Sequence, residues 1–282
     1  MKLDKFEEFK LIEIKAKEQS YNLLSGNHLS KIYGEGYDFG ELREYQIGDD
    51  IRKINWTISA KMQRPFIKEL HANRELSVVV TALISPSLYF GLKDTKMVRE
   101  KQDLITEISL LLGYSTIYNQ DLFTGIYYFN NKSYLTPPTK QIYNIEEFAK
   151  KIYNLNILNS TLNYDISTDL FSKIINRSLI FIIGDFLEDI DLSILSKRHE
   201  VVVIIVRHKY EVNPKALGEI ILKNPSTEEE ESRFFGKGII QKYIKEVKKS
   251  DDKLYNHLNQ FSIKYININT NDNILDKLVN CL

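Results

Sequence analysis

Residues 77–87 read Ser-Val-Val-Val-Thr-Ala-Leu-Ile-Ser-Pro-Ser and begin the regular part of this chain. The run from Ser77 to Ile84 is almost wholly apolar, which is typical of a β-strand buried on both faces. Two serines, Ser85 and Ser87, flank the proline that ends the run. The stretch therefore predicts a core strand with hydroxyl groups at its carboxyl end.

Alternating strand and helix patterns follow this first strand. Further buried strands are predicted at 178–184, 201–206 and 263–268, and a hairpin at 121–129 and 133–135 around Asn130-Asn131. Helices are predicted at 94–118, 145–155, 165–175, 192–196 and 272–279, with a long one within 232–260. Buried strands that alternate with helices predict an α/β fold: a doubly wound, mainly parallel sheet covered on both faces.

The region before Ser77 has a different character. Residues 3–24 show the apolar spacing of an amphipathic helix, and Gly26 is a suitable terminator. A charged block with little periodicity then runs to residue 76. We therefore expect an N-terminal helical and irregular extension, residues 1–76, and an α/β domain, residues 77–282.

Composition excludes several classes of protein. Of the 282 residues, 43% are hydrophobic, which suffices for a sizeable core, and 38 basic residues balance 38 acidic ones, which gives no bias toward nucleic acid. A single cysteine, Cys281, rules out a disulfide framework. The first residues are charged, and the longest apolar run, 201–206, is too short to span a membrane. We expect a soluble cytoplasmic protein with no membrane span and no nucleic-acid partner.

Polar residues at strand ends are the candidates for a binding site. In doubly wound sheets, ligands bind beyond the carboxyl ends of the strands, where the strand order reverses. Asp185 follows the strand at 178–184, as Ser85 and Ser87 follow the first strand, and Thr136 and Thr139 come after the hairpin. Such oxygen donors suit a hard cation such as magnesium.

The charged block at 40–61 identifies a family. The residues concerned are Arg43, Glu44, Tyr45, Gly48, Asp49, Asp50, Arg52, Ile54, Asn55, Trp56, Ser59, Ala60 and Lys61. Their order and spacing resemble the hallmark of the bacterial domain-of-unknown-function family 58, R-E-Y-x-x-G-D-D-x-R-x-I-D-W-x-x-S-A-R. Asn55 replaces the usual aspartate and Lys61 the usual arginine. Further matches follow in the family's order: Ser85-x-Ser87 with Phe90-Gly91, Gly184-Asp185-Phe186-Leu187 and His199-Glu200-Val201-Val202.

The resemblance implies a von Willebrand factor A-like, Rossmann-like domain with a metal-ion-dependent adhesion site. In that site the pattern D-x-S-x-S, a threonine and a distal aspartate hold magnesium. Leu83 stands at the leading aspartate and offers no oxygen, so we expect a degenerate site without a metal cofactor. Its residues are Leu83, Ser85, Ser87, Asp185 and a threonine, either Thr139 or Thr136. We expect the serines to cap the following helix and backbone amides to satisfy Asp185.

The charged block allows two interpretations. We expect Tyr45 and Trp56 to be buried anchors, because aromatic side chains carry much apolar area. The arginines either pair internally with Glu44, Asp49 or Asp50, or belong to a surface that engages a partner.

The resemblance also implies a function. Family members are commonly encoded beside a MoxR-type AAA+ ATPase, which implies a non-enzymatic adaptor or scaffold that works with such an ATPase in protein assembly or remodelling. This chain has no Walker motif, so it is not the ATPase. One alternative is a metal-dependent hydrolase that uses Asp49, Asp50 and Asp185. Another is a metal-free scaffold that binds through the long helix within 232–260.

Overall fold

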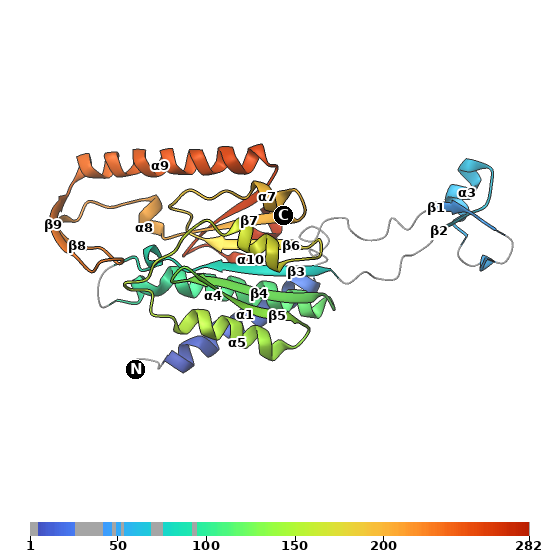
Figure 1. Ribbon diagram of the computed structural model, residues 1–282, viewed down its shortest axis with the longest axis horizontal. Helices are drawn as coiled ribbons and strands as arrows, with labels where there is room; N and C mark the ends of the chain where they lie inside the picture. Colours follow the sequence, from blue (N-terminus) through green and yellow to red (C-terminus); the bar gives the residue numbers. More distant parts are fainter. Residues whose placement is uncertain are drawn as a thin grey trace.

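A six-stranded sheet forms the centre of the computed structural model, which describes residues 5–25, 42–46, 49–51, 54–68, 76–91 and 95–281 (Figure 1). Its strands are β3 (Ser77–Leu83), β4 (Leu122–Phe129), β5 (Lys132–Thr139), β6 (Leu179–Gly184), β7 (Glu200–Arg207) and β10 (Lys264–Asn269). They lie in the order β10-β7-β6-β3-β4-β5, and all are parallel except β5, which runs antiparallel to β4. The chain winds outward in both directions from β3 and β6, so the predicted doubly wound, mainly parallel fold is confirmed.

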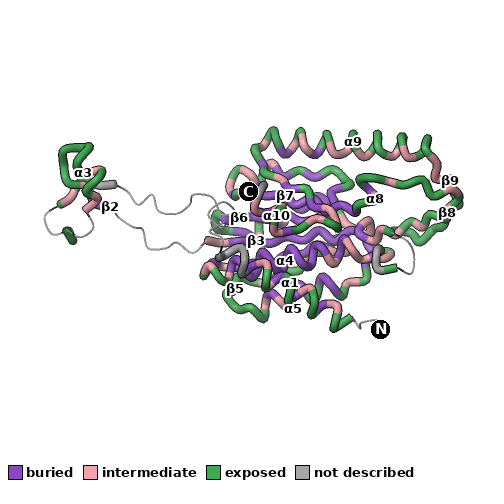
Figure 2. The backbone as a smooth tube through the Cα atoms, turned by 180° about the vertical axis from the view of Figure 1, so that it is seen from behind, coloured by how far each residue is buried: buried purple, intermediate pink, exposed green. Residues whose placement is uncertain are grey.

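Helices cover both faces of this sheet. On one side lie α1 (Lys5–Ser25), α4 (Glu100–Tyr118), α5 (Ile142–Asn154) and α10 (Ile274–Cys281), and on the other α6 (Ser167–Lys173), α7 (Ser193–Ser196) and α9 (Lys237–Gln260). Side chains alternate along β3: Val78 and Val80 enter the first apolar core, while Val79 and Leu83 enter the second. Burial is concentrated in β3, β4, β6 and β7 and in α4 (Figure 2). Among the described helices, none has the length and apolarity to cross a bilayer.

Two parts of the predicted pattern differ from the structure. The strand expected at 133–135 is longer, because β5 continues through Pro137 and Pro138 at the edge of the sheet, where a missing N–H is tolerated. No helix or strand was predicted between the strand at 201–206 and the long helix, but the structure has α8 (Lys209–Val212) and an antiparallel hairpin of β8 (Gly218–Lys223) and β9 (Glu230–Phe235). These hairpin strands are largely exposed, so they show no apolar alternation of the usual kind.

Helix α1 packs against the sheet unit, although the expected division at residue 76 assigns it to the extension. The ring of Phe9 lies 5.4 Å from that of Tyr153 in α5. Lys15 forms an ion pair of 2.8 Å with Glu107 in α4. The N-terminal helix is therefore a structural part of the α/β unit.

Residues 42–68 contain a small unit of their own. Its elements are β1 (Leu42–Glu44), α3 (Trp56–Met62) and β2 (Phe66–Lys68), and the two strands pair antiparallel. Asn55 caps α3 by accepting a hydrogen bond from the Ile58 amide at 3.2 Å. Since asparagine and aspartate cap helices about equally well, the replacement of the usual aspartate by Asn55 preserves this role.

Candidate functional site

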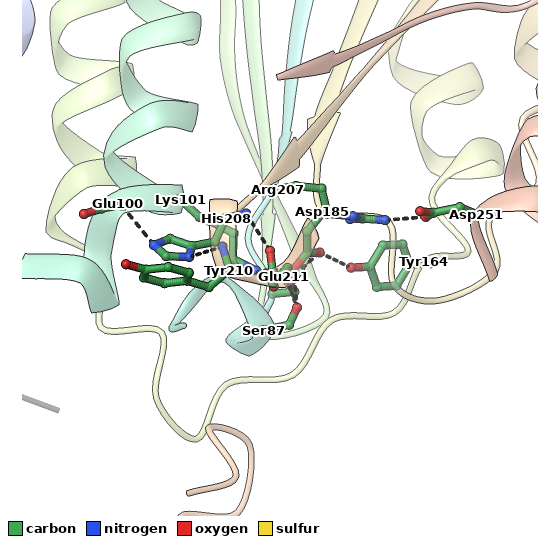
Figure 3. A network of polar contacts seen from close by, with 11 residues as sticks. Ser87, Glu100, Lys101, Tyr164, Asp185, Arg207, His208, Tyr210, Glu211 and Asp251 are labelled. Atoms are coloured by element: carbon green, nitrogen blue, oxygen red, sulfur yellow. Dashed lines mark hydrogen bonds and ion pairs between the residues drawn. The ribbon is translucent and has the colours of Figure 1, made fainter. Parts of the chain in front are cut away.

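The hydroxyls after β3 and the carboxylate after β6 meet at the point where the strand order reverses. Ser85 Oγ donates to Asp185 Oδ1 at 3.1 Å, and Ser87 Oγ donates to Asp185 Oδ2 at 2.5 Å. Asp185 is completely buried. The structure thus brings together the three strand-end residues that the sequence singled out, because β3 and β6 are adjacent and parallel. We call these three residues, together with Tyr164, Lys101 and Glu211, the strand-end cluster (Figure 3).

The contacts within this cluster differ from those expected. Ser85 lies at the N-cap of the short 3-10 helix η2 (Pro86–Leu88), but its side chain makes no capping hydrogen bond. Its hydroxyl donates to Asp185 instead. Backbone amides were expected to satisfy Asp185, whereas its carboxylate accepts hydrogen bonds from side chains, including the phenolic hydroxyl of Tyr164 at 3.1 Å.

The threonine expected in the cluster lies elsewhere. Thr139 pairs with Phe123 near the amino end of β4, whereas Leu83 at the end of β3 pairs with Tyr128. Those positions on β4 are about 17 Å apart at the usual rise per residue. Thr139 Oγ1 instead accepts from Gln141 N and Asn144 Nδ2 at the start of α5. The antiparallel direction of β5 carries Thr139 away from the cluster, and Thr136, opposite Gly125, lies on the same outer strand.

Leu83 is part of the apolar core beneath the cluster. Its side chain is fully buried and belongs to the second core together with Ile126 and Phe186. A methyl group placed on Gly184 would come within 3.0 Å of Leu83 Cβ, so the two strands are in close contact at this point. The position that the resemblance assigns to a carboxylate is occupied by a tightly packed hydrocarbon.

A lysine completes the cluster. Lys101, in the first turn of α4, is fully buried, and its Nζ lies 2.6 Å from Glu211 Oε1 and 3.5 Å from Asp185 Oδ2. The ammonium group also lies 5.5 Å from the centre of the Phe90 ring. Glu211 is held in place because its other oxygen accepts from the His208 amide at 2.6 Å. Sequence reasoning missed Lys101 and Glu211, since neither follows a strand directly.

The charges around Asp185 favour its ionised form. Burial by itself raises the pKa of Asp185, but the positive charge of Lys101, the hydrogen bond from Ser87 and the charge of Arg207 together lower it below its usual value. Burial also raises the pKa of the Tyr164 hydroxyl, which therefore remains a proton donor. Arg207 ends β7 and is itself paired with Asp251 at 2.8 Å.

A histidine borders the cluster on the side of α4. His208 Nδ1 accepts from the Tyr210 amide at 3.2 Å, which leaves the proton on Nε2, 3.0 Å from Glu100 Oε2. Burial lowers the pKa of His208, and the facing carboxylates Glu100 and Glu211 offset that effect only in part. The imidazole is thus a neutral member of the network.

The donors of the cluster do not fit a magnesium ion. Magnesium requires about six oxygen ligands in octahedral geometry and is usually held by one or two carboxylates. Leu83 supplies no oxygen, and the space between Asp185 and Glu211 holds the Lys101 ammonium. Across the described ranges, no group of three or more His, Cys, Asp or Glu side chains is placed to hold a metal.

The family block forms most of the small unit 42–68. Ser59 Oγ accepts from the Phe66 amide at 2.8 Å, and Glu44 pairs with Arg64 at 3.2 Å. Asp49 Oδ2 accepts from the Gln46 amide at 2.8 Å, while Asp50 is exposed. Gly48 and Arg52 lie outside the described residues, as does the side chain of Arg43.

The expectation that both aromatic residues of this block are buried is wrong for Trp56. Trp56 is 68% exposed, although Ser59, three residues further along α3, is buried. Ile51 and Met62 of the same unit are 62% and 59% exposed. Tyr45 is half-buried. The small unit therefore presents large apolar side chains to solvent. The spacing of apolar residues in a helix of seven residues does not predict this exposure.

Comparisons with known proteins match most of this chain. The family model described as "Protein of unknown function DUF58" matches residues 41–249. An uncharacterised protein of Mycobacterium tuberculosis, Rv1480, is 38% identical over 80 residues, which cover 28% of this chain and 25% of that protein. The chain thus spans about a quarter of the length of the curated relatives it matches.

The solved structures found by the structural comparison share less sequence identity with this chain. The conserved hypothetical protein BatB from Bacteroides thetaiotaomicron has a TM-score of 0.40 and 12% identity, covering 73% of this chain and 96% of its own. The SpRpn10 VWA domain has a TM-score of 0.37 and 11% identity, covering 73% and 95%. The fold class rests on the strand order and strand directions described above.

Proposed function

The chain belongs to the family described as protein of unknown function DUF58, and on that premise we propose that it is a non-enzymatic protein-binding adaptor. The matched region includes both the small unit 42–68 and most of the sheet. The family description assigns no activity, so the proposal depends on what these two regions offer to a partner.

The exposure of Trp56 is the observation that carries the proposal. The hydrogen bonds made by Asn55 and Ser59 build the unit without help from the indole, which points to solvent. Exposed tryptophan contributes much apolar area, and tryptophan is enriched among the residues that dominate protein–protein binding. A family block that folds its own backbone and leaves Trp56 exposed is suited to contact another protein.

The partner we propose is a MoxR-type AAA+ ATPase, as the family resemblance implies. The chain would act with that ATPase in protein assembly or remodelling. The strand-end cluster would have a structural role in this scheme, as a degenerate adhesion site that requires no metal cofactor, because its charged groups already satisfy one another.

The hydrolase alternative finds less support. It requires Asp185 to bind a metal together with Asp49 and Asp50, but the carboxylate of Asp185 is buried and already accepts hydrogen bonds from Ser85, Ser87 and Tyr164. Phosphatase and nuclease assays with added magnesium or manganese should therefore give no activity. Activity that Asp49→Asn abolishes would favour the hydrolase.

Affinity capture with a matched pair of variants tests the adaptor proposal. The tagged full chain is incubated at physiological salt with lysate of its source organism, and captured proteins are identified by mass spectrometry. We expect an AAA+ ATPase with the unchanged chain and at least a tenfold loss with Trp56→Ala. Phe234→Ala, in the β8–β9 hairpin, is the control, because Phe234 is also 68% exposed.

Two outcomes would contradict this proposal. Failure of the unchanged chain to capture an AAA+ ATPase would contradict the proposed partner. Loss of capture with Phe234→Ala but not with Trp56→Ala would move the contact to the hairpin and the adjoining helix α9, which is the scaffold alternative.

A further inference from the structure

We infer that the Lys101 ammonium is the resident cation of the strand-end cluster and occupies the place where the family resemblance puts a divalent metal. This inference goes beyond the proposed function and does not depend on the partner. It rests on the contacts of one buried side chain.

The geometry places the ammonium between two acidic groups. Lys101 reaches from α4 toward Asp185, which follows β6, and Glu211, which lies in α8 (Figure 3). Neither lysine nor aspartate is exposed, and the Glu211 side chain is 5% exposed. Three elements distant in sequence therefore converge on a single positive charge.

Burial makes this cation indispensable. Two buried carboxylates without a counter-charge would be strongly unfavourable, and the Phe90 ring, 5.5 Å from Lys101 Nζ, adds an attraction of its own. A divalent ion could enter only by displacing an ammonium that is covalently attached and has no exposed surface. Ser85 and Ser87 thus still donate to Asp185, but the cation beside that carboxylate is the Lys101 ammonium and not a bound metal ion.

Leu83 and Lys101 form a complementary pair of features. A metal site of the implied kind combines a doubly charged ion with an aspartate at position 83. This chain has a singly charged group and a neutral leucine in their places. Leu83 removes one negative charge, and the Lys101 ammonium carries one positive charge fewer than a divalent ion. The two differences offset each other, so the net charge of the site stays nearly the same.

A set of four proteins tests the inference by titration with magnesium and with manganese in a calorimeter. The proteins are the unchanged chain, Leu83→Asp, Lys101→Ala and the double variant. We expect binding tighter than about 1 mM only in the double variant, which has both the added oxygen ligand and the vacated space. Metal binding by the unchanged chain or by Leu83→Asp would overturn the inference, and so would a folded double variant that binds neither ion.

Amine labelling of the unchanged chain provides a second test that needs no folded variant. The native protein is treated with an acylating reagent, and the labelled lysines are quantified by peptide mass spectrometry. We expect Lys101 to react at least about tenfold more slowly than Lys253, which is 68% exposed, with and without 10 mM magnesium, a concentration about ten times that binding limit. Equal reactivity of the two lysines, or faster labelling of Lys101 on addition of magnesium, would overturn the inference.

Discussion

The strand-end cluster and the small unit 42–68 use their side chains in opposite ways. In the cluster, a lysine, two carboxylates and the hydroxyls of Ser85 and Tyr164 are buried, each with a partner. In the small unit, charged residues lie near the surface and the tryptophan of the family block is exposed. The comparison shows that polarity alone does not decide burial: a charged group can be buried where the fold supplies its partners, and an apolar group stays exposed where the unit is too small to cover it.

The largest effect should come from breaking the cluster at its cation. Lys101→Met keeps the volume of the side chain but leaves buried Glu211 without its ion-pair partner and buried Asp185 with only the charge of Arg207 nearby. We expect the free energy of unfolding to fall by about 3–5 kcal/mol in urea denaturation. Lys253→Met, which removes an exposed partner of Asp189, should change it by less than about 0.5 kcal/mol. Similar effects of both substitutions would mean that the buried pairing is no more important than a surface one.

Asp185→Asn should weaken the cluster and alter its response to acid. The loss of the charge that faces Lys101 should cost about 2–3 kcal/mol at pH 7. The pKa of Asp185 is lowered in the folded chain, so its stabilising effect is present above the unfolded value, about 3.9, and is lost as the pH falls through the folded value. Urea denaturation from pH 7 to pH 2.5 should therefore show a shallower acid loss in the variant. An unchanged acid slope would exclude a lowered pKa for Asp185.

Tyr164→Phe should have a smaller effect, because it removes one hydrogen bond and no charge. The buried carboxylate would lose a donor at 3.1 Å, and we expect a loss of about 1–2 kcal/mol by thermal or urea unfolding. Tyr143→Phe serves as the control, since Tyr143 is 66% exposed. If both variants were equally stable, the Tyr164 hydroxyl would have no structural role in the cluster.

The smallest effect on stability should come from the other side of the comparison. Trp56→Ala removes a side chain that is mostly in solvent, so the free energy of unfolding should change by less than about 0.5 kcal/mol, although partner capture should be lost. A loss above about 2 kcal/mol in the same denaturation experiment would show that Trp56 is the buried anchor predicted from the sequence.

The cluster itself was predictable only in part. Ser85, Ser87 and Asp185 were found because they follow apolar strands, and parallel neighbouring strands bring such ends together. Thr139 was assigned wrongly although the hairpin was predicted, because the antiparallel return of β5 places its last residue opposite Phe123, at the amino end of β4 and away from the strand ends that form the cluster. Lys101 escaped notice because it lies 84 positions from Asp185 and 110 from Glu211, while its near neighbours resemble an ordinary helix start.

The sequence by itself determined the alternation of strands and helices, the family block and the hydroxyls at the end of β3, because each depends on residues close together in the chain. Only the tertiary structure decided that a lysine lies between two buried carboxylates and that Trp56 faces solvent. The physical reason is that the energy of a buried charge depends on which distant groups surround it. That environment is created by strand order and helix packing, which local patterns do not specify.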